Sequence, residues 1–152
     1  MREEEVQRYG RQILLRELGG RGQRRLMEAR VEARSDSPAM ESALTYLRAG
    51  GTQVGEGGSV LLTTQPSSTP GAVVVVSGGV AWKSAAACTA CWEKLLASLP
   101  SSAGPSVLVG SLAALAVQRL ILGWAEPLGL LAWDGERLVS RSAERCAVHS
   151  ST

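Results

Sequence analysis

The stretch Val73-Val74-Val75-Val76 decides the fold class of this chain. Four consecutive β-branched residues favour a strand, and a run without a polar residue is typical of a strand buried on both faces. A second strand is predicted at Val60 to Thr64. Residues 50–58 and 65–71 are rich in Gly, Ser, Thr and Pro and are therefore predicted to be loops.

Helical segments are predicted on both sides of these strands. The best-defined helix is Pro38 to Ala49, because Ser37 is a favoured N-cap, Pro38 suits the first helical position and Gly50 is a typical stop. The other predicted helices are Glu3 to Leu18 ending at Gly19-Gly20, a short turn from Gly22 to Ala29, a short helix through Leu95, and a buried helix from Val107 to Leu122. Because helices and strands alternate, the predicted fold class is α/β.

A β-hairpin is predicted near the end of the chain. Leu130 to Trp133 and Arg137 to Val139 are the predicted strands, joined by Asp134-Gly135 as a two-residue turn. With 152 residues, of which 45% are hydrophobic, we expect one domain with one core. Trp92 and Trp133 are the predicted aromatic anchors of that core.

All three cysteines and the only histidine form two spaced pairs, Cys88-x-x-Cys91 and Cys146-x-x-His149. Each spacing lets two side chains converge on one metal, so together they predict a four-ligand zinc site. Four protein ligands leave no position for water or substrate, so the zinc would be structural. Two alternatives stay open: Cys88 and Cys91 as small buried hydrophobic residues, or as a redox pair, with His149 in a tail.

The charge of the chain is small but unevenly spread. The net charge is +2, and residues 1–34 carry nine Arg against six Glu. We interpret this segment as a solvated helical surface and expect no nucleic-acid binding. Three cysteines, no signal peptide and no apolar run of spanning length lead us to expect a reducing cytoplasm and no membrane partner.

Both ends of the chain resemble the ThiF/MoeB/HesA adenylyltransferases, bacterial relatives of ubiquitin-activating enzymes. The N-terminal resemblance lies in residues 8–15, in Gly19-Gly20-x-Gly22-Gln23-x-x-Leu26 and in Arg30-Val31. The C-terminal resemblance lies in Cys88 and Cys91, residues 109–115, Leu120-x-Leu122-Gly123, Glu126-Pro127-Leu128 and the hairpin before Cys146. The family's second metal pair is normally Cys-x-x-Cys, so His149 is a conservative departure.

This resemblance implies a Rossmann-like fold with a C-terminal zinc-binding segment and a β-hairpin. It divides the single domain 1–152 into an N-terminal helical segment at 1–34, a shortened remnant of the nucleotide fold at 35–79, and a zinc-binding and dimerisation region at 80–152. The family's activity is adenylation, with magnesium ATP, of the C-terminal glycine of a ubiquitin-like or sulfur-carrier protein. Its phosphate loop is G-x-G-G-x-G, whose backbone amides approach the phosphates.

In the ungapped alignment, Ser35, Ser37, Pro38 and Met40 occupy the positions of the four glycines. Pro38 lacks a backbone donor, Met40 adds bulk, and the serines reach positive φ less freely than glycine. Asp36 adds a negative charge, and Glu32 and Arg34 stand where the family has an apolar strand. The segment from Gly51 to Gly79 is too short for the family's ribose, phosphate and magnesium residues. We therefore expect that the chain does not bind ATP or magnesium.

Thr63-Thr64 and Ser77-Gly78-Gly79 resemble strand ends that border the family's site, although the second is equally well an ordinary turn. Arg11 occupies the position of an arginine that, in the family, reaches into the neighbouring subunit's ATP site; the alternative is a surface arginine. In the family the helix corresponding to Val107 to Leu122 helps form the dimer, and Ala113, Ala114 and Ala116 suggest close helix packing there.

Three hypotheses follow for the function. The first is a shortened pseudoenzyme, a zinc-stabilised binding subunit that dimerises with itself or with a full-length ThiF/MoeB-like protein. It could also bind a ubiquitin-like or sulfur-carrier protein. The second is an active adenylyltransferase with an atypical nucleotide site. The third is a redox or zinc-responsive switch that uses Cys88 and Cys91.

Overall fold

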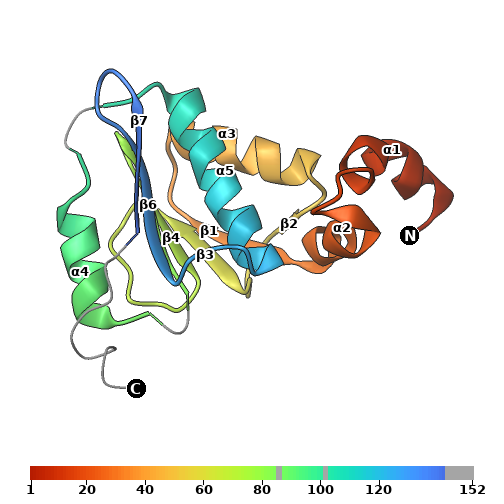
Figure 1. Ribbon diagram of the computed structural model, residues 1–152, viewed down its shortest axis with the longest axis horizontal. Helices are drawn as coiled ribbons and strands as arrows, with labels where there is room; N and C mark the ends of the chain where they lie inside the picture. Colours follow the sequence, from red (N-terminus) through yellow and green to blue (C-terminus); the bar gives the residue numbers. More distant parts are fainter. Residues whose placement is uncertain (85–86, 101–102, 143–152) are drawn as a thin grey trace.

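The computed structural model describes residues 1–84, 87–100 and 103–142, and its centre is a seven-stranded mixed sheet (Figure 1). The strand order is β2-β1-β3-β4-β5-β6-β7. Strands β2, β1, β3 and β4 are parallel to one another, and β5, β6 and β7 continue the sheet from β4 with antiparallel pairings. The strands are β1 (Arg30–Arg34), β2 (Gln53–Val54), β3 (Val60–Thr63), β4 (Ala72–Val76), β5 (Gly79–Lys83), β6 (Leu128–Trp133) and β7 (Leu138–Ser142).

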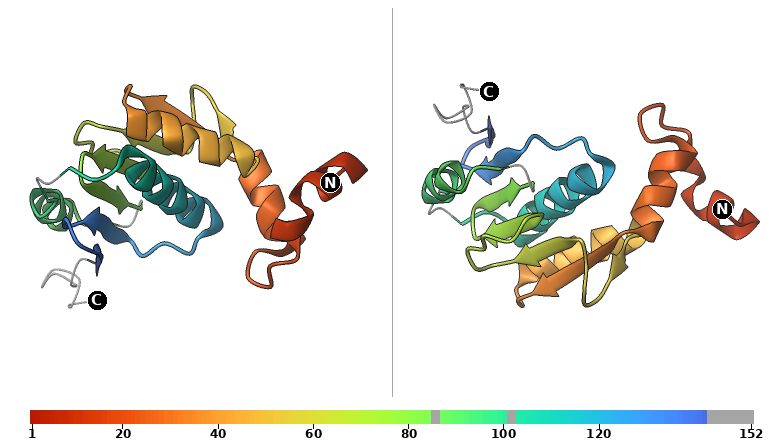
Figure 2. Two further views of the ribbon diagram at one scale, coloured as in Figure 1. Left: turned by 90° about the horizontal axis from the view of Figure 1, so that it is seen from above. Right: turned by 90° about the horizontal axis from the view of Figure 1, so that it is seen from below.

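Helices cover both faces of the sheet, which confirms the α/β class (Figure 2). Helices α3 (Pro38–Ala49) and α5 (Ser106–Leu122) pack against each other on one face, and α4 (Thr89–Ala97) packs against β5 and β6 on the other. Helices α1 (Glu3–Ile13) and α2 (Gly19–Glu28) lie beside the sheet, at one end of the molecule (Figure 1). Among the described residues, no helix is long and apolar enough to span a membrane.

The valine run in β4 shows why the sheet needs helices on both faces. Val73 and Val75 belong to the core under α3 and α5, whereas Val74 belongs to the core under α4. All three are at most 2% exposed. The sequence-based prediction of a strand buried on both faces is therefore confirmed.

Strand β1 carries charged side chains although it lies between β2 and β3. Val31 and Ala33 face the core under α3 and α5, so Glu32 and Arg34 alternate to the opposite face, where α4 covers β5 and β6 and not β1. Glu32 and Arg34 form an ion pair at 2.6 Å. This hydrogen bond lowers the pKa of Glu32. The charges are tolerated because this part of the sheet has only one covered face.

The connection between β3 and β4 is a loop of residues 64–71. Parallel strands usually need a crossover of a dozen residues or more, commonly a helix. Here two buried side chains hold the loop: Trp92 Nε1 donates to the Ser67 carbonyl at 2.8 Å, and Lys83 Nζ donates to the Ser68 carbonyl at 3.1 Å. A short loop, held by hydrogen bonds from α4 and β5, thus connects these strands instead of a crossover helix.

Helix α3 forms as predicted, and the two N-terminal helices differ from the prediction. Ser37 caps α3 by accepting a hydrogen bond from the Met40 amide at 3.2 Å. The first helix ends at Ile13 instead of Leu18, and Gly19 begins α2 instead of ending a helix. Gly19 has φ +58°, a conformation that glycine adopts readily and that allows the chain to reverse direction between the helices.

Two of the observed strands, β2 and β5, were not predicted from the sequence. The two-residue β2 lies within the expected loop 50–58, and β5 follows the turn Ser77-Gly78, where no strand was expected. Both exist because of pairing with distant strands. In β5, Trp82 is 3% exposed and serves as a core aromatic residue, as Trp92 does at 2%, whereas the predicted anchor Trp133 is only half-buried.

The terminal hairpin is confirmed, but its turn is longer than predicted. Trp133 pairs with Leu138, so residues 134–137 form a four-residue connection instead of a two-residue turn. Asp134 Oδ1 accepts hydrogen bonds from the amides of Glu136 at 3.0 Å and Arg137 at 2.9 Å. An aspartate that binds its own turn in this way favours the longer loop.

Candidate functional site

The candidate site is a crevice at the carboxyl ends of the parallel strands. From β1 the chain runs through α3 to β2 on one side, whereas β3 lies on the other side of β1. In open α/β sheets, ligands bind at such a switch point. A cavity of about 490 Å³ lies here, between the N-terminal end of α3, the ends of β3 and β4, and the start of α5.

The first turn of α3 offers few free hydrogen-bond donors to this crevice. Pro38, at the first helical position, has no amide hydrogen. The Met40 amide is bonded to the Ser37 hydroxyl at 3.2 Å, and the Glu41 amide is bonded to the Ser37 carbonyl at 2.9 Å. Of the amides in this turn, that of Ala39 takes part in neither of these two hydrogen bonds. The N-terminus of α3 therefore has few amide donors left for an anion.

A second set of hydrogen bonds ties the two strands together at the switch point. Ser35 Oγ accepts from the Thr64 amide at 3.1 Å and from Thr64 Oγ1 at 2.7 Å, and it donates to the Arg34 carbonyl. Ser35 directly follows β1 and Thr64 directly follows β3. These bonds join the two strand ends where a bound phosphate group would have to approach the backbone.

The cavity is lined by small and uncharged residues. Among the described residues, its lining includes no Lys, Arg, Asp or Glu. The lining residues from strand ends and helix starts are Ser37, Pro38, Ala39, Thr64, Val75, Val76, Ser77 and Ser106. Ser77 also fixes the wall, because its carbonyl accepts a hydrogen bond from the Gly104 amide at 2.7 Å. The crevice can therefore hold a small neutral group, but it offers no cation to a polyphosphate and no carboxylate to magnesium.

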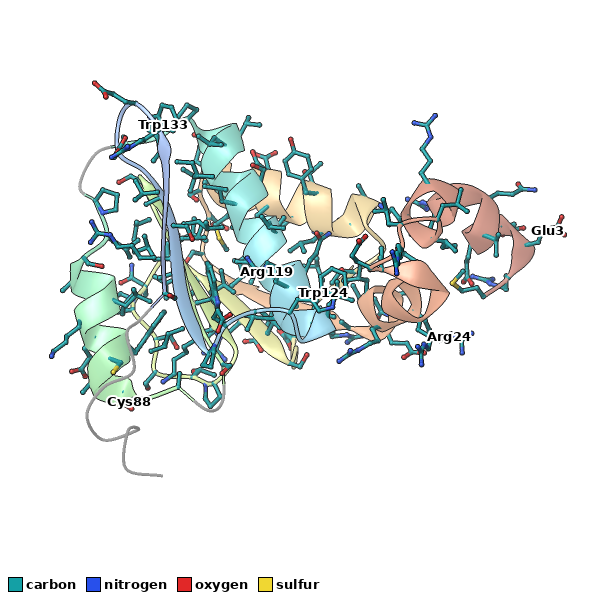
Figure 3. All side chains as sticks on the ribbon, viewed as in Figure 1. Glu3, Arg24, Cys88, Arg119, Trp124 and Trp133 are labelled. Atoms are coloured by element: carbon teal, nitrogen blue, oxygen red, sulfur yellow. The ribbon has the colours of Figure 1, made fainter. Side chains whose placement is uncertain are left out.

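The cysteine pair lies elsewhere, on the first turn of α4 (Figure 3). Cys88 is the N-cap residue and its carbonyl accepts from the Trp92 amide at 3.0 Å. Cys91 is the third residue of the helix and packs against the core under α4. Both side chains are half-buried. A cysteine pair on a tight helical turn fits the chemistry of a zinc edge.

The other two predicted zinc ligands, Cys146 and His149, lie outside the described residues. Within the described ranges, no group of three or more His, Cys, Asp or Glu residues could hold a metal ion. The sheet register still constrains where the chain leaves β7: Ser142 pairs with Gly129, and the adjacent Leu128 pairs with Lys83 of β5. The end of β7 and the end of β5 at Lys83 therefore lie at the same end of the sheet.

Arg11 is exposed on α1, far from the crevice of its own chain. Helix α2 contacts the C-terminal ends of α3 and α5, because Gln23 Nε2 donates to the Gly50 carbonyl at 2.9 Å and Arg25 Nη1 donates to the Leu122 carbonyl at 3.0 Å. Helix α1 packs on α2. The length of α3, roughly 18 Å at 1.5 Å per residue, separates this end from the crevice. Arg11 could act in such a crevice only if the crevice belonged to another subunit.

The small residues of α5 have a different role from the one expected. Ala113, Ala114 and Ala116 are at most 4% exposed, and they pack within the same chain against α3 and the sheet. The exposed side of α5 instead presents Val107 and Leu115, which are 60% and 44% exposed. The alanines therefore allow close packing inside the domain and are not available for a contact between subunits.

Sequence reasoning missed Ser35, Thr64 and Lys83 as interacting residues. The signal for the first pair is present but weak: each is a hydroxyl residue directly after a strand. Only the parallel pairing of β1 with β3 brings them together. Lys83 is 4% exposed and gives no sequence signal, because a lysine at the end of a strand is ordinarily solvated.

No model of a protein family matches this chain, and no curated protein matches it.

Proposed function

We propose that the chain is a shortened ThiF/MoeB-like pseudoenzyme, a zinc-stabilised subunit that dimerises or binds another protein and does not bind ATP. The observation that supports it most is the crevice at the ends of β3 and β4, beside the N-terminal end of α3. Near it, Ser35 accepts hydrogen bonds from Thr64, and Ser37 accepts one from the Met40 amide of its own helix. A nucleotide would have to break these bonds and would find no cation in the lining.

The energetic argument against nucleotide binding follows from these contacts. Phosphate binding at a strand-to-helix loop depends on several unpaired backbone amides and a close backbone approach. Here Pro38 provides no donor and the Met40 amide already has a partner. Losing each such hydrogen bond to a charged group costs roughly 1.5–3 kcal/mol of affinity. Two or three missing donors reduce affinity by several orders of magnitude.

Zinc in this proposal has a structural role. Cys88 and Cys91 would supply one edge of the tetrahedron from the first turn of α4, and Cys146 and His149 the other. From Ser142, four residues lead to Cys146, and an extended chain of that length spans at most about 14 Å. Because β7 and β5 end at the same end of the sheet, the zinc would join the last strand to α4.

Native mass spectrometry of the purified protein, with and without magnesium ATP, tests the metal, the oligomer and the nucleotide together. The expected species is a dimer with one zinc per chain whose mass does not change when magnesium ATP is added. In Cys91→Ser, we expect the zinc to be lost. A mass increase of one nucleotide per chain would refute the pseudoenzyme proposal.

The position of the crevice favours a second candidate, an active adenylyltransferase with an atypical nucleotide site. A cavity of about 490 Å³ at a switch point is large enough for a small ligand. This candidate predicts exchange between ATP and pyrophosphate in the presence of the carrier protein. Absence of exchange with each ubiquitin-like or sulfur-carrier protein tested, together with an unchanged native mass, would leave the first proposal in place.

A further inference from the structure

Helix α1 lies at one end of the molecule and packs mainly on α2 (Figure 1). Tyr9 is its one buried residue, and its ring lies near Gly51, beyond the end of α3. With 11 residues α1 is shorter than the roughly 12–15 residues that an isolated helix needs in water. Its apolar residue Val6 is 46% exposed, and after the helix the C-cap residue Leu14 and the adjacent Leu15 are 84% and 55% exposed.

The outward face of α1 has an ordered charge pattern. Glu3, Gln7 and Arg11 follow one another at intervals of four residues, so they lie along one side of the helix, and all three are exposed. Glu3 lies at the tip of the molecule (Figure 3), and the adjacent Glu4 is also exposed. The outward side is therefore acidic in its first turn and basic beyond it, where Arg8 and Arg11 are exposed.

These charges are not neutralised within the chain. Among the described residues, the ion pair at this end of the molecule joins Arg2 to Glu5 at 3.1 Å. Glu3, Glu4 and Arg11 take part in none of the three ion pairs found there, and Arg8 lies over the Tyr9 ring at 5.6 Å. The acidic and basic ends of the face are thus available to a partner.

We infer that the partner of this face is α1 of a second copy of the chain, packed antiparallel about a two-fold axis at Gln7. In that arrangement Glu3 meets Arg11 of the partner subunit, and the reverse contact forms by symmetry. A parallel arrangement would bring like charges together. At the ends, Leu14 approaches Met1 of the partner subunit, and Met1 is itself 39% exposed.

This inference specifies the dimer of the proposed function and rests on its dimerising role, but not on zinc or on the loss of ATP binding. It also changes the expectation for Arg11. An arginine that pairs with Glu3 of the partner subunit is not extended into a neighbouring crevice. The contact is built from exposed charges, so we expect a weak dimer whose affinity falls as salt screens those charges.

Reversing the charges at one end of α1 in one variant, and at the other end in a second variant, tests the arrangement. One variant carries Glu3→Lys and Glu4→Lys, so that its outward face is entirely basic; the other carries Arg8→Glu and Arg11→Glu, so that its face is entirely acidic. Sedimentation velocity at about 50 mM salt, where surface charges are less screened, should show that each variant alone dissociates at least roughly tenfold more readily than the wild type. Mixing the two variants should restore a dimer, and native mass spectrometry should identify it as containing one chain of each.

The matched control is Arg21→Glu with Arg24→Glu, which makes the same charge change on the exposed side of α2. It should dimerise as the wild type does. Each of three results would overturn the inference: a monomeric wild type, half-reversed variants that still dimerise, or a mixture of the two variants that stays monomeric. The mixture also controls for fraying of α1 in the variants, because a frayed helix would not restore the dimer. A dimer that obeys these charges but binds ATP would overturn the proposed function alone.

Discussion

At the scale of single residues, Trp92 is a buried anchor whose polar group reaches across to a loop. The side chain is 2% exposed, and its indole Nε1 donates to the Ser67 carbonyl at 2.8 Å. Trp92→Phe keeps much of the apolar contact but leaves the partly buried Ser67 carbonyl without this donor. We expect a loss of about 1–3 kcal/mol in the free energy of unfolding, measured by urea denaturation.

The control for this change is Trp124→Phe, because Trp124 is 45% exposed and its side chain makes no hydrogen bond within the described part of the chain. Its unfolding free energy should stay within roughly 0.5 kcal/mol of the wild type. Equal losses in the two variants would show that the Ser67 contact does not stabilise the loop of residues 64–71.

A second prediction for a single residue concerns how the turn at Asp134 responds to pH. The amides of Arg137 and Glu136, bonded to its carboxylate, lower its pKa below the ordinary value of 3.8. A depressed pKa in the folded state means that these bonds stabilise the turn above pH 3.8 and are lost as the pH falls through the lowered pKa.

Nuclear magnetic resonance can follow this loss through the amide shifts of Glu136 and Arg137. In the wild type both amide signals should move together below pH 3.8. In Asp134→Asn, which keeps an acceptor but does not titrate, this transition should disappear. Persistence of the transition in the variant would assign it to another group.

At the scale of secondary-structure elements, the pair α3 and α5 depends on Gly110. A Cβ placed there would lie 2.5 Å from the Ala39 carbonyl oxygen and 2.5 Å from Ser42 Cβ. The two helices approach so closely only because position 110 has no side chain. Gly110→Ala should therefore force them apart and reduce the free energy of unfolding by about 1–3 kcal/mol.

Gly10 of α1 is the matched control, since it also lies inside a helix but has no atom within 4 Å of its added Cβ. Gly10→Ala should be neutral or should stabilise the protein by roughly 0.5–1 kcal/mol, because alanine favours a helix interior. Chemical denaturation of both variants compares them directly. A similar loss in both would point to helix propensity and not to the contact between helices.

At the scale of the whole molecule, the proposed zinc would connect the C-terminal strand to α4 and so hold the two ends of the antiparallel half together. Structural zinc contributes on the order of 10 kcal/mol in small zinc peptides, whereas a domain has only about 5–15 kcal/mol of total stability. Chelation should therefore unfold at least the half of the domain that contains α4.

Cys91→Ser tests the same connection without a chelator. We expect insoluble or protease-sensitive protein, with cleavage concentrated around α4, because the serine is a poor zinc ligand. Thr89→Ser, an exposed position on the same helical turn, should behave as the wild type. Normal solubility and an unchanged melting temperature in Cys91→Ser would count against the zinc site.

The sequence by itself determined the features that depend on local chemistry. The cap at Ser37, the proline at the start of α3, the long apolar helix and the valine run of β4 act over a few residues. Such signals have the same meaning wherever the segment is placed. For this reason the α/β class, the position of α3 and the existence of the terminal hairpin could all be predicted.

Only the tertiary structure decided what depends on contacts between distant segments. Strand β5 exists because β4 and β6 pair with it, and Glu32 is tolerated in β1 because none of the described helices covers that face of the strand. The hydrogen bonds between Ser35 and Thr64 require β1 and β3 to be neighbours, which neither segment encodes alone. Pairing partners and covered faces are collective properties of the whole chain, so local patterns could not reveal them.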